Sequence, residues 1–238
     1  MKLSNKVFRA YISFCRIEGL NRNFFFESFL HDDEKKYFRT LRYERRINSY
    51  IIGRFAAKKA VSLLVKEKNF SKINIQNGVF NQPILEYDLF NNLQVSLTHC
   101  GQLGAAIVFQ EQFLIGIDVE NTKSNKNKVL EGILTENEKI LIHNTPFEYN
   151  EFLVMLWTLK ESISKTIKTG LTVPLSIFEI KSIRFMDGYC ISSYSNFYQY
   201  QSISFLEGNY VFSITYPKKV ELNIDIDRIK VKLNEILK

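Results

Sequence analysis

The feature that most constrains the fold of this chain is the segment of residues 152–168, FLVMLWTLKESISKTIK. Its apolar residues recur at helical spacing, which predicts an amphipathic helix with one buried face. Glu161 and Lys165 lie four residues apart, so their side chains share a face of this helix. Taken alone, this pair is typical of an ordinary ion pair on a helix surface. A second acidic pair, Asp118 and Glu120, follows an apolar run upstream, and the two segments together suggest one site.

Length and composition are those of an ordinary globular protein. The chain has 238 residues, 45% hydrophobic and 24% charged, enough for one large domain or two small ones. Cys15, Cys100 and Cys190 are widely spaced and form no C-x-x-C motif, which argues against a disulfide framework and a zinc site. No apolar run approaches the roughly 20 residues of a membrane span, and the N-terminus is typical of a strand rather than a signal peptide. We therefore expect a cytoplasmic protein.

The positive charge is concentrated in the first third of the chain. The formal net charge is +7; residues 1–70 hold 16 basic and 7 acidic residues, and the remainder holds 16 basic and 18 acidic residues. Such a region favours a polyanionic ligand, which would be a phosphate compound, a nucleic acid or an acidic protein. A solvated helix face without any partner explains the pattern equally well.

Local patterns predict two halves, which we delimit as residues 1–108 and 109–238, each with a long helix and several antiparallel strands. In the first half we expect a strand, a short buried helix, one or two basic helices and three strands, over residues 6–15, 23–30, 35–66, 73–75, 84–87 and 93–98. In the second half we expect a β-hairpin, a long helix, four strands and a terminal helix, over residues 105–120, 149–168, 178–183, 189–194, 199–206, 210–216 and 225–238. Thr135 and Glu138 have the spacing of a capping box.

Three acidic residues, Asp118, Glu120 and Glu161, give the first indication of the chemistry. Asp118 and Glu120 lie two residues apart in a predicted strand, so both leave the same face. Two neighbouring carboxylates repel each other unless a cation lies between them, and their hard oxygen ligands suit Mg²⁺. An exposed acidic end of a strand would show the same pattern. With Glu161 as a third carboxylate, and Lys160 and Lys165 as charges for phosphate oxygens, the set fits a metal-assisted phosphoryl-type transfer.

The order and spacing of these motifs resemble those of the 4′-phosphopantetheinyl transferases, above all the long, two-domain surfactin-type (Sfp-type) branch. The resemblance covers residues 34–216. Its main motifs are Gly116-Ile117-Asp118-Val119-Glu120, Thr135-Glu136-Asn137-Glu138, Trp157-x-x-Lys160-Glu161-Ser162-x-x-Lys165 and Gly170-Leu171-x-x-Pro174-Leu175. Further matches lie at Arg45-Arg46, Gly53-Arg54-x-x-Ala57-Lys58, Thr98-His99 and Gly208-Asn209-Tyr210-Val211-Phe212-Ser213.

This resemblance implies an α+β fold, in which two pseudo-symmetric halves each pack a small antiparallel sheet on a long helix, with the active site in the cleft between them. It also implies transfer of the 4′-phosphopantetheine arm of coenzyme A to a serine of an acyl or peptidyl carrier protein, with release of 3′,5′-ADP. The N-terminal half would bind the nucleotide of coenzyme A, and the C-terminal half would hold the metal and catalytic residues. We expect a monomer whose partners are coenzyme A and a carrier protein, with no membrane and no nucleic acid.

The resemblance also assigns roles to individual residues. Asp118, Glu120 and Glu161 would hold Mg²⁺ against the pyrophosphate of coenzyme A. Glu161, or a metal-bound water, would take the proton from the carrier serine. Lys165 would stabilise or protonate the leaving phosphate, and Lys160 would assist at the pyrophosphate. The 3′-phosphate would be held in the N-terminal half by a set in which His99 and Arg46 come first, followed by Arg45 and Lys35. Thr98, beside His99, would also belong to the coenzyme A-binding residues.

Two departures and two alternatives accompany this interpretation. Asn81-Gln82-Pro83 stands where the family often has a Gly-Lys-Pro turn, so a lysine contact to coenzyme A is missing; Thr98 replaces the usual serine beside the histidine. One alternative function is a metal-dependent phosphodiesterase or nuclease that uses the same carboxylates and the basic first third. The other is a non-catalytic relative that binds coenzyme A.

Overall fold

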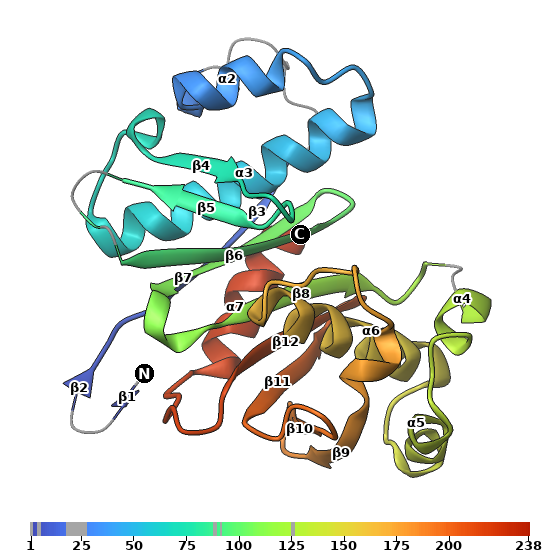
Figure 1. Ribbon diagram of the computed structural model, residues 1–238. Helices are drawn as coiled ribbons and strands as arrows, with labels where there is room; N and C mark the ends of the chain where they lie inside the picture. The colour runs from blue at the N-terminus through green and yellow to red at the C-terminus, as the bar shows by residue number, and fades with distance from the viewer. Residues whose placement is uncertain (1, 4–5, 18–27, 88–89, 91, 125–126) are drawn as a thin grey trace. The chain divides into compact units, whose positions relative to one another are not determined.

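The computed structural model describes residues 2–3, 6–17, 28–87, 90, 92–124 and 127–238, and it divides into two compact units (Figure 1). The N-terminal unit is Val7–Phe113. The C-terminal unit is Leu114–Lys238 together with the first residues of the chain. The predicted boundary between residues 108 and 109 falls inside a strand, β7 (Leu103–Gln110), close to this division.

The N-terminal unit packs a long helix on an antiparallel sheet. The sheet has the order β3-β7-β6, with β3 at Tyr11–Arg16 and β6 at Leu93–Cys100. Helix α3 (Glu44–Val65) packs against all three strands. Its approach to β7 is close, since a Cβ at Gly104 would lie 3.0 Å from the Ile52 carbonyl oxygen. The remaining elements of this unit and of the N-terminus are β1 (Lys2–Leu3), β2 (Lys6–Val7), α2 (Asp32–Phe38), η1 (Phe70–Lys72), β4 (Asn74–Asn77), β5 (Pro83–Glu86) and η2 (Glu111–Phe113).

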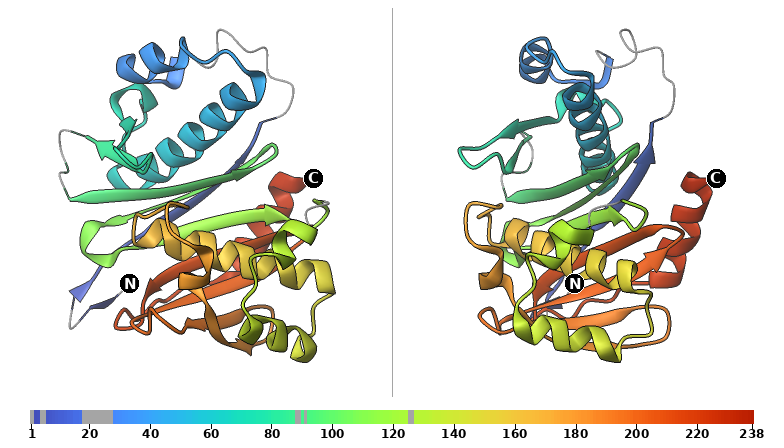
Figure 2. Two further views of the ribbon diagram at one scale, coloured as in Figure 1. Left: turned by 45° about the vertical axis from the view of Figure 1, so that its right-hand side comes forward. Right: turned by 90° about the vertical axis from the view of Figure 1, so that its right-hand side faces the viewer.

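The C-terminal unit repeats this plan with a larger sheet. Its five strands have the order β8-β12-β11-β10-β9, and helix α6 (Tyr149–Thr166) packs against β8 and β12 (Figure 2). The strands are β8 (Gly116–Asn121), β9 (Ile180–Phe185), β10 (Cys190–Tyr194), β11 (Tyr200–Glu207) and β12 (Tyr210–Pro217). The other elements are α4 (Asn127–Glu131), α5 (Glu136–Leu141), η3 (Ile142–Asn144), η4 (Leu175–Phe178) and α7 (Ile226–Leu237).

The two units share one topology, as the family resemblance implies. In each, a first strand pairs with the last strand, the last pairs with the one before it, and the long helix follows the first strand. In the N-terminal unit β5 lies beside β6 and pairs with β4, which completes the same order of five strands. Single contacts repeat as well: Lys59 Nζ lies 3.0 Å from the Phe14 carbonyl oxygen, and Lys165 Nζ lies 3.3 Å from that of Ile117. The predicted α+β fold is therefore confirmed.

Most predicted elements are present, and one is wrong. The long helix, the four later strands and the terminal helix are α6, β9 to β12 and α7, and the capping box of Thr135 and Glu138 starts α5. The predicted hairpin over residues 105–120 does not form, because β7 pairs with β3 and β6 whereas β8 pairs with β12. A 3₁₀ turn at Glu111–Phe113 and a positive φ at Leu114 separate the two strands. The helix predicted over residues 23–30 lies mostly outside the described residues.

Within the part of the chain that is described, no helix combines the length and the apolar character that crossing a bilayer requires.

Candidate functional site

Strand β8 presents its two acidic residues on the face that packs against α6. Ile117 and Val119 are buried in the core at 1% and 0% exposure, so Asp118 and Glu120 alternate to the other face. Asp118 is itself buried, and Glu120 is half-buried. The prediction that both carboxylates leave one face of a strand is therefore confirmed.

Helix α6 comes unusually close to β8 at the start of this strand. A Cβ built on Gly116 would lie 2.1 Å from the backbone oxygen of Ser162. This distance is too short for any residue that has a Cβ, so the close approach requires glycine. The close approach lets Lys165 reach the strand, where its Nζ lies 2.6 Å from Asp118 Oδ1. Gly116 thereby places the charged face of α6 against the acidic strand.

Glu161 is electrostatically coupled to this pair. Burial, and to a lesser extent the carboxylates of Asp118 and Glu120, raise the pKa of Glu161 to about 7, against the opposing effect of Lys165. The structure thus brings together four predicted residues from two elements. A carboxyl group that titrates near neutral pH can accept a proton from a substrate hydroxyl and release it again.

Trp157 joins the helix to the acidic strand. Its indole Nε1 donates a hydrogen bond to Glu120 Oε1 at 3.4 Å, and its ring packs at the edge of the core of the C-terminal unit. The sequence predicted a core anchor for this residue. The structure adds that Trp157 also orients the Glu120 carboxylate.

The three carboxylates differ from a preformed metal site. Among the described residues, no three His, Cys, Asp or Glu side chains are already gathered in a group that could hold a metal ion. The chemistry of Asp118, Glu120 and Glu161 nevertheless suits a divalent cation. The three carboxylates are close enough for Asp118 and Glu120 to raise the pKa of Glu161, and a cation between them would relieve this repulsion. The residues therefore fit Mg²⁺ in type and charge.

Lys160 does not belong to this group. Its Nζ is completely buried, lies 2.9 Å from Glu138 Oε1 and donates to the Leu175 carbonyl oxygen at 3.1 Å. Glu138 in turn accepts from the backbone N–H groups of Thr135 and Ile180. The structure thus places Lys160 in a buried ion pair apart from the other four residues, and its predicted role at the pyrophosphate stays a prediction. Its partner Glu138 was recognised in the sequence only as a capping residue.

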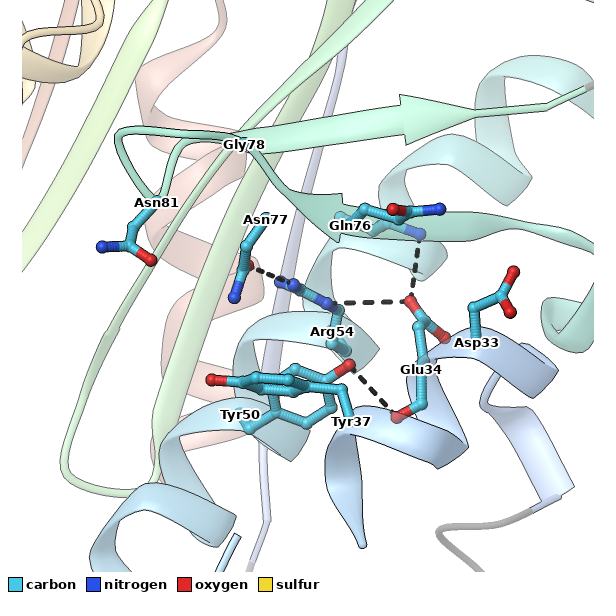
Figure 3. A pocket seen from close by; sticks show the side chains of 10 residues that line it. Asp33, Glu34, Tyr37, Tyr50, Arg54, Gln76, Asn77, Gly78 and Asn81 are labelled. Carbon is cyan, nitrogen blue, oxygen red and sulfur yellow. Dashed lines mark hydrogen bonds and ion pairs between the residues drawn. The ribbon is translucent and has the colours of Figure 1, made fainter. Parts of the chain in front are cut away.

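In the N-terminal unit, Arg46 and His99 line one cavity of about 280 Å³ together with Tyr50 and Arg54. A second cavity of about 360 Å³ shares Tyr50 and Arg54 and extends to Gln76 and Gly78 (Figure 3). The cavities provide aromatic rings, side-chain amides and cationic groups, which suits a ligand with both a ring and a phosphate.

Arg54 lines both of these cavities, and the sequence motif that contains it assigned it no role. Its guanidinium lies 4.7 Å from the centre of the Tyr50 ring, and its Nη2 donates to Asn77 Oδ1 at 2.6 Å. Figure 3 shows Arg54 between Asn77 and Glu34, whose Oε1 lies 3.7 Å from its Nε. The basic stripe on α3 contained this arginine, but helical spacing alone does not reveal that it contacts a strand.

The remaining predicted residues lie apart from the cavity that Arg46 and His99 line. Thr98 is buried on the face of β6 opposite to His99. Lys35 pairs with Asp32 at 2.9 Å along α2, and Arg45 is exposed in the first turn of α3.

The turn that replaces the Gly-Lys-Pro motif keeps a left-handed residue, since Asn81 has φ 60°. Asparagine tolerates this conformation better than most residues. Gln82 bonds within the same loop, where its Oε1 accepts from the Phe80 N–H at 2.9 Å. A tight turn therefore forms here without the lysine.

Comparison with known proteins gives one family and several relatives. Residues 114–215 match the 4′-phosphopantetheinyl transferase superfamily. The holo-[acyl-carrier-protein] synthase of Staphylococcus carnosus (strain TM300) is 34% identical over 91 residues, which are 36% of this chain and 77% of that protein. The same enzyme of Staphylococcus epidermidis (strain ATCC 12228) is 34% identical over 114 residues, 45% of this chain and 97% of that protein.

Among solved structures, a holo-(acyl-carrier-protein) synthase from Bacillus anthracis str. Ames in complex with CoA (3′,5′-ADP) is 29% identical, with a TM-score of 0.37. The match covers 44% of this chain and 97% of that one. The segment shared with the superfamily contains Asp118, Glu120, Glu161 and Lys165.

Proposed function

This chain belongs to the 4′-phosphopantetheinyl transferase superfamily, and we propose that it moves the 4′-phosphopantetheine arm of coenzyme A to a serine of an acyl or peptidyl carrier protein. One observation supports this most: Asp118, Glu120, Glu161 and Lys165 form a coupled group in the matched segment. The names of the relatives, which are holo-[acyl-carrier-protein] synthases, point to the same reaction.

In the proposed step, the serine oxygen of the carrier attacks the phosphorus that bears the pantetheine arm. The bond from this phosphorus to the bridging pyrophosphate oxygen breaks, and 3′,5′-ADP leaves with the electron pair. Glu161 accepts the proton of the serine hydroxyl. Lys165 releases its bond to Asp118 in part and donates to the leaving phosphate, whose developing charge it stabilises.

The residues that would hold Mg²⁺ are Asp118, Glu120 and Glu161. When bound, the ion would neutralise the pyrophosphate and orient it for attack. Trp157 would keep the Glu120 carboxylate in place for this purpose through its indole N–H. Lys160 has no part in this proposal, because it is the buried partner of Glu138.

We further propose that the N-terminal unit supplies the residues that bind the nucleotide of coenzyme A. Arg46 and His99 line the same cavity and would hold the 3′-phosphate, with Arg45 and Lys35 adding positive charge nearby in the chain. This division of roles agrees with the two-domain, Sfp-type branch, in which one chain carries both units. A monomer in the cytoplasm follows from the same proposal.

The test is transfer to apo carrier proteins. The protein, coenzyme A and Mg²⁺ are incubated with apo carriers of the fatty-acid, polyketide and non-ribosomal peptide types. The expected result is a gain of one phosphopantetheine group on at least one carrier, measured by intact mass, together with release of 3′,5′-ADP. Asp118→Asn should lose most of this activity while its circular dichroism spectrum stays that of the wild type. Absence of transfer to every carrier, with the protein folded, would overturn the proposal.

A further inference from the structure

A layer of hydroxyl groups lies between α6 and the sheet of the C-terminal unit. It consists of seven side chains, each at most 1% exposed: Thr158, Ser162, Tyr194, Ser202, Ser204, Ser213 and Thr215. Each hydroxyl is hydrogen-bonded to at least one other in the layer. A helix ordinarily packs on a sheet through apolar side chains, and a buried hydroxyl is costly unless its bond is made. Such a layer therefore tolerates little displacement.

The bonds form a first row that crosses from strand to strand to helix. Ser204 and Ser213 are register partners with their Oγ atoms 2.8 Å apart, and Ser213 Oγ lies 2.8 Å from Thr158 Oγ1. Thr158 donates its single hydroxyl proton to the Met155 carbonyl oxygen at 2.9 Å. Ser213 must therefore donate to Thr158, and Ser204 must donate to Ser213.

A second row repeats this arrangement one helical turn later. Ser202 and Thr215 are register partners with hydroxyl oxygens 2.6 Å apart, and Thr215 Oγ1 lies 2.6 Å from Ser162 Oγ. Ser162 donates to the Leu159 carbonyl oxygen at 2.9 Å, so the bonds again run from β11 through β12 to α6. Tyr194 adds a further contact to Thr215 at 3.1 Å.

Both rows lie at the level of the acidic strand. In the pairing of β12 with β8, Ser213 is opposite Asp118 and Thr215 is opposite Gly116. Opposed residues of an antiparallel pair share a face, so the first row lies beside Asp118. The second row lies where a Cβ on Gly116 would meet the Ser162 backbone oxygen at 2.1 Å.

Hydroxyl rows fix a helix more tightly than an apolar contact does. A helix advances 1.5 Å per residue, and a hydrogen bond of 2.6–2.8 Å is lost over a smaller displacement than that. We propose that the two rows set the position of α6 along β8, and that Thr158 and Ser162 are positioning residues that hold Glu161 and Lys165 beside Asp118. The effect on rate rests on the proposed transfer reaction, whereas the position of the helix does not.

The main test is the double variant Thr158→Val, Ser162→Ala, which removes both helix-side hydroxyls. Ser213 and Thr215 keep partners within the sheet, so no buried hydroxyl loses all its bonds and the variant should fold. We expect kcat to fall about tenfold or more, because small misplacements of reacting groups are costly, and KM for coenzyme A to change by less than about twofold. Thr158→Ser keeps the hydroxyl and should retain the wild-type rate.

Two controls separate positioning from general loss of stability. Leu233→Ala opens a cavity in α7, where Leu233 is fully buried, and should lower Tm with kcat unchanged. Ser182→Ala, Ser193→Ala removes a hydroxyl pair of 2.7 Å from β9 and β10 and should change neither quantity. A double variant with lower Tm but wild-type kcat, or a loss of kcat shared with Leu233→Ala, would overturn the proposal.

Trp157 gives a measurement that does not need activity. It is the one tryptophan of the chain, lies on α6 and bonds to Glu120 on β8. Its emission maximum should shift in the double variant and stay at the wild-type value in Thr158→Ser. If the wild type transfers nothing, the proposed function fails while a shifted emission still supports the positioning role. An unchanged emission in the double variant would contradict that role.

Discussion

The carboxyl group of Glu161 lies where its charge destabilises the fold and serves the reaction. Its pKa is raised from 4.5 to about 7 by burial and by Asp118 and Glu120. Between these two values the folded protein binds more protons than the unfolded chain, so the free energy of unfolding falls as the pH rises. Well above pH 7 the ionised group costs on the order of 3 kcal/mol of stability.

Glu161→Gln should remove both effects. At about pH 8 and without Mg²⁺, the variant should be more stable than the wild type by on the order of 3 kcal/mol, since no ionised carboxylate is buried at this position. Transfer should fall about 100-fold or more through loss of the proton acceptor. Urea unfolding at about pH 5 and pH 8 measures the first effect. Parallel pH dependence of the two proteins would show that Glu161 does not titrate in this range.

Lys160, on the same helix, forms a buried ion pair that connects secondary-structure elements. Its pair with Glu138 is fully buried and joins α6 to the start of α5 and to β9. The N-terminal unit has a matching pair, in which Glu34 caps α2, accepts from Ile75 of β4 and pairs with Lys58. The repeated arrangement indicates a role in joining elements within each unit.

Removing one partner of such a pair should be more harmful than removing both. Lys160→Met leaves Glu138 buried without its cation and should cost about 3 kcal/mol or more, whereas Lys160→Met, Glu138→Gln should recover part of the loss. Thermal unfolding of both variants measures the difference. Because Lys160 lies outside the proposed site, the folded fraction of each should keep near wild-type kcat; a deep loss of kcat in a fully folded Lys160→Met would contradict this.

Gly116 allows α6 and β8 to approach each other closely. A Cβ there would lie 2.1 Å from the Ser162 oxygen and 2.8 Å from the Thr166 backbone nitrogen, which are backbone atoms that cannot turn away. Gly116→Ala should therefore push the helix from the strand and lengthen the 2.6 Å contact of Lys165 with Asp118. We expect lower Tm and a loss of kcat of about tenfold or more. Gly132→Ala, where the nearest atoms are 3.5 Å away, is the matched control and should change little.

The sequence predicts elements and faces better than partners. The charged residues of β8 and α6 were recognisable because strand and helix periods place them on definite faces, and their spacing matched a known family. The partner of Lys160 could not be predicted, because Glu138 lies on another element and only tertiary packing brings the two together. The false hairpin over residues 105–120 has the same cause, since alternation identifies a strand without choosing its neighbour. Arg54 and Tyr50 likewise form part of a cavity only once β4 is in place.

At the scale of the molecule, the two units have the same order of strands and helix but different side chains at equivalent positions. The contact of Lys165 with the Ile117 carbonyl is matched by that of Lys59 with Phe14, so Cys15 occupies the place of Asp118. Burial raises the pKa of Cys15 to about 11, so it is an inert thiol rather than an acid. One turn before Lys59, Phe55 stands where the other helix has Glu161. The acidic set therefore occurs in the C-terminal unit, and the N-terminal unit retains its cavities for another task.

The proposed role of the N-terminal unit in nucleotide binding can be tested with dephospho-coenzyme A, which lacks the 3′-phosphate. If Arg46 and His99 hold the 3′-phosphate, Arg46→Ala should weaken binding of coenzyme A about tenfold or more, since a charge-assisted contact is lost. The same variant should bind dephospho-coenzyme A, which has no 3′-phosphate, as the wild type does. Isothermal titration measures both ligands, and Arg42→Ala, an exposed arginine before α3, serves as the control. Equal weakening of both ligands would mean that Arg46 acts on another part of the nucleotide, whereas a change confined to coenzyme A assigns the 3′-phosphate to the N-terminal unit.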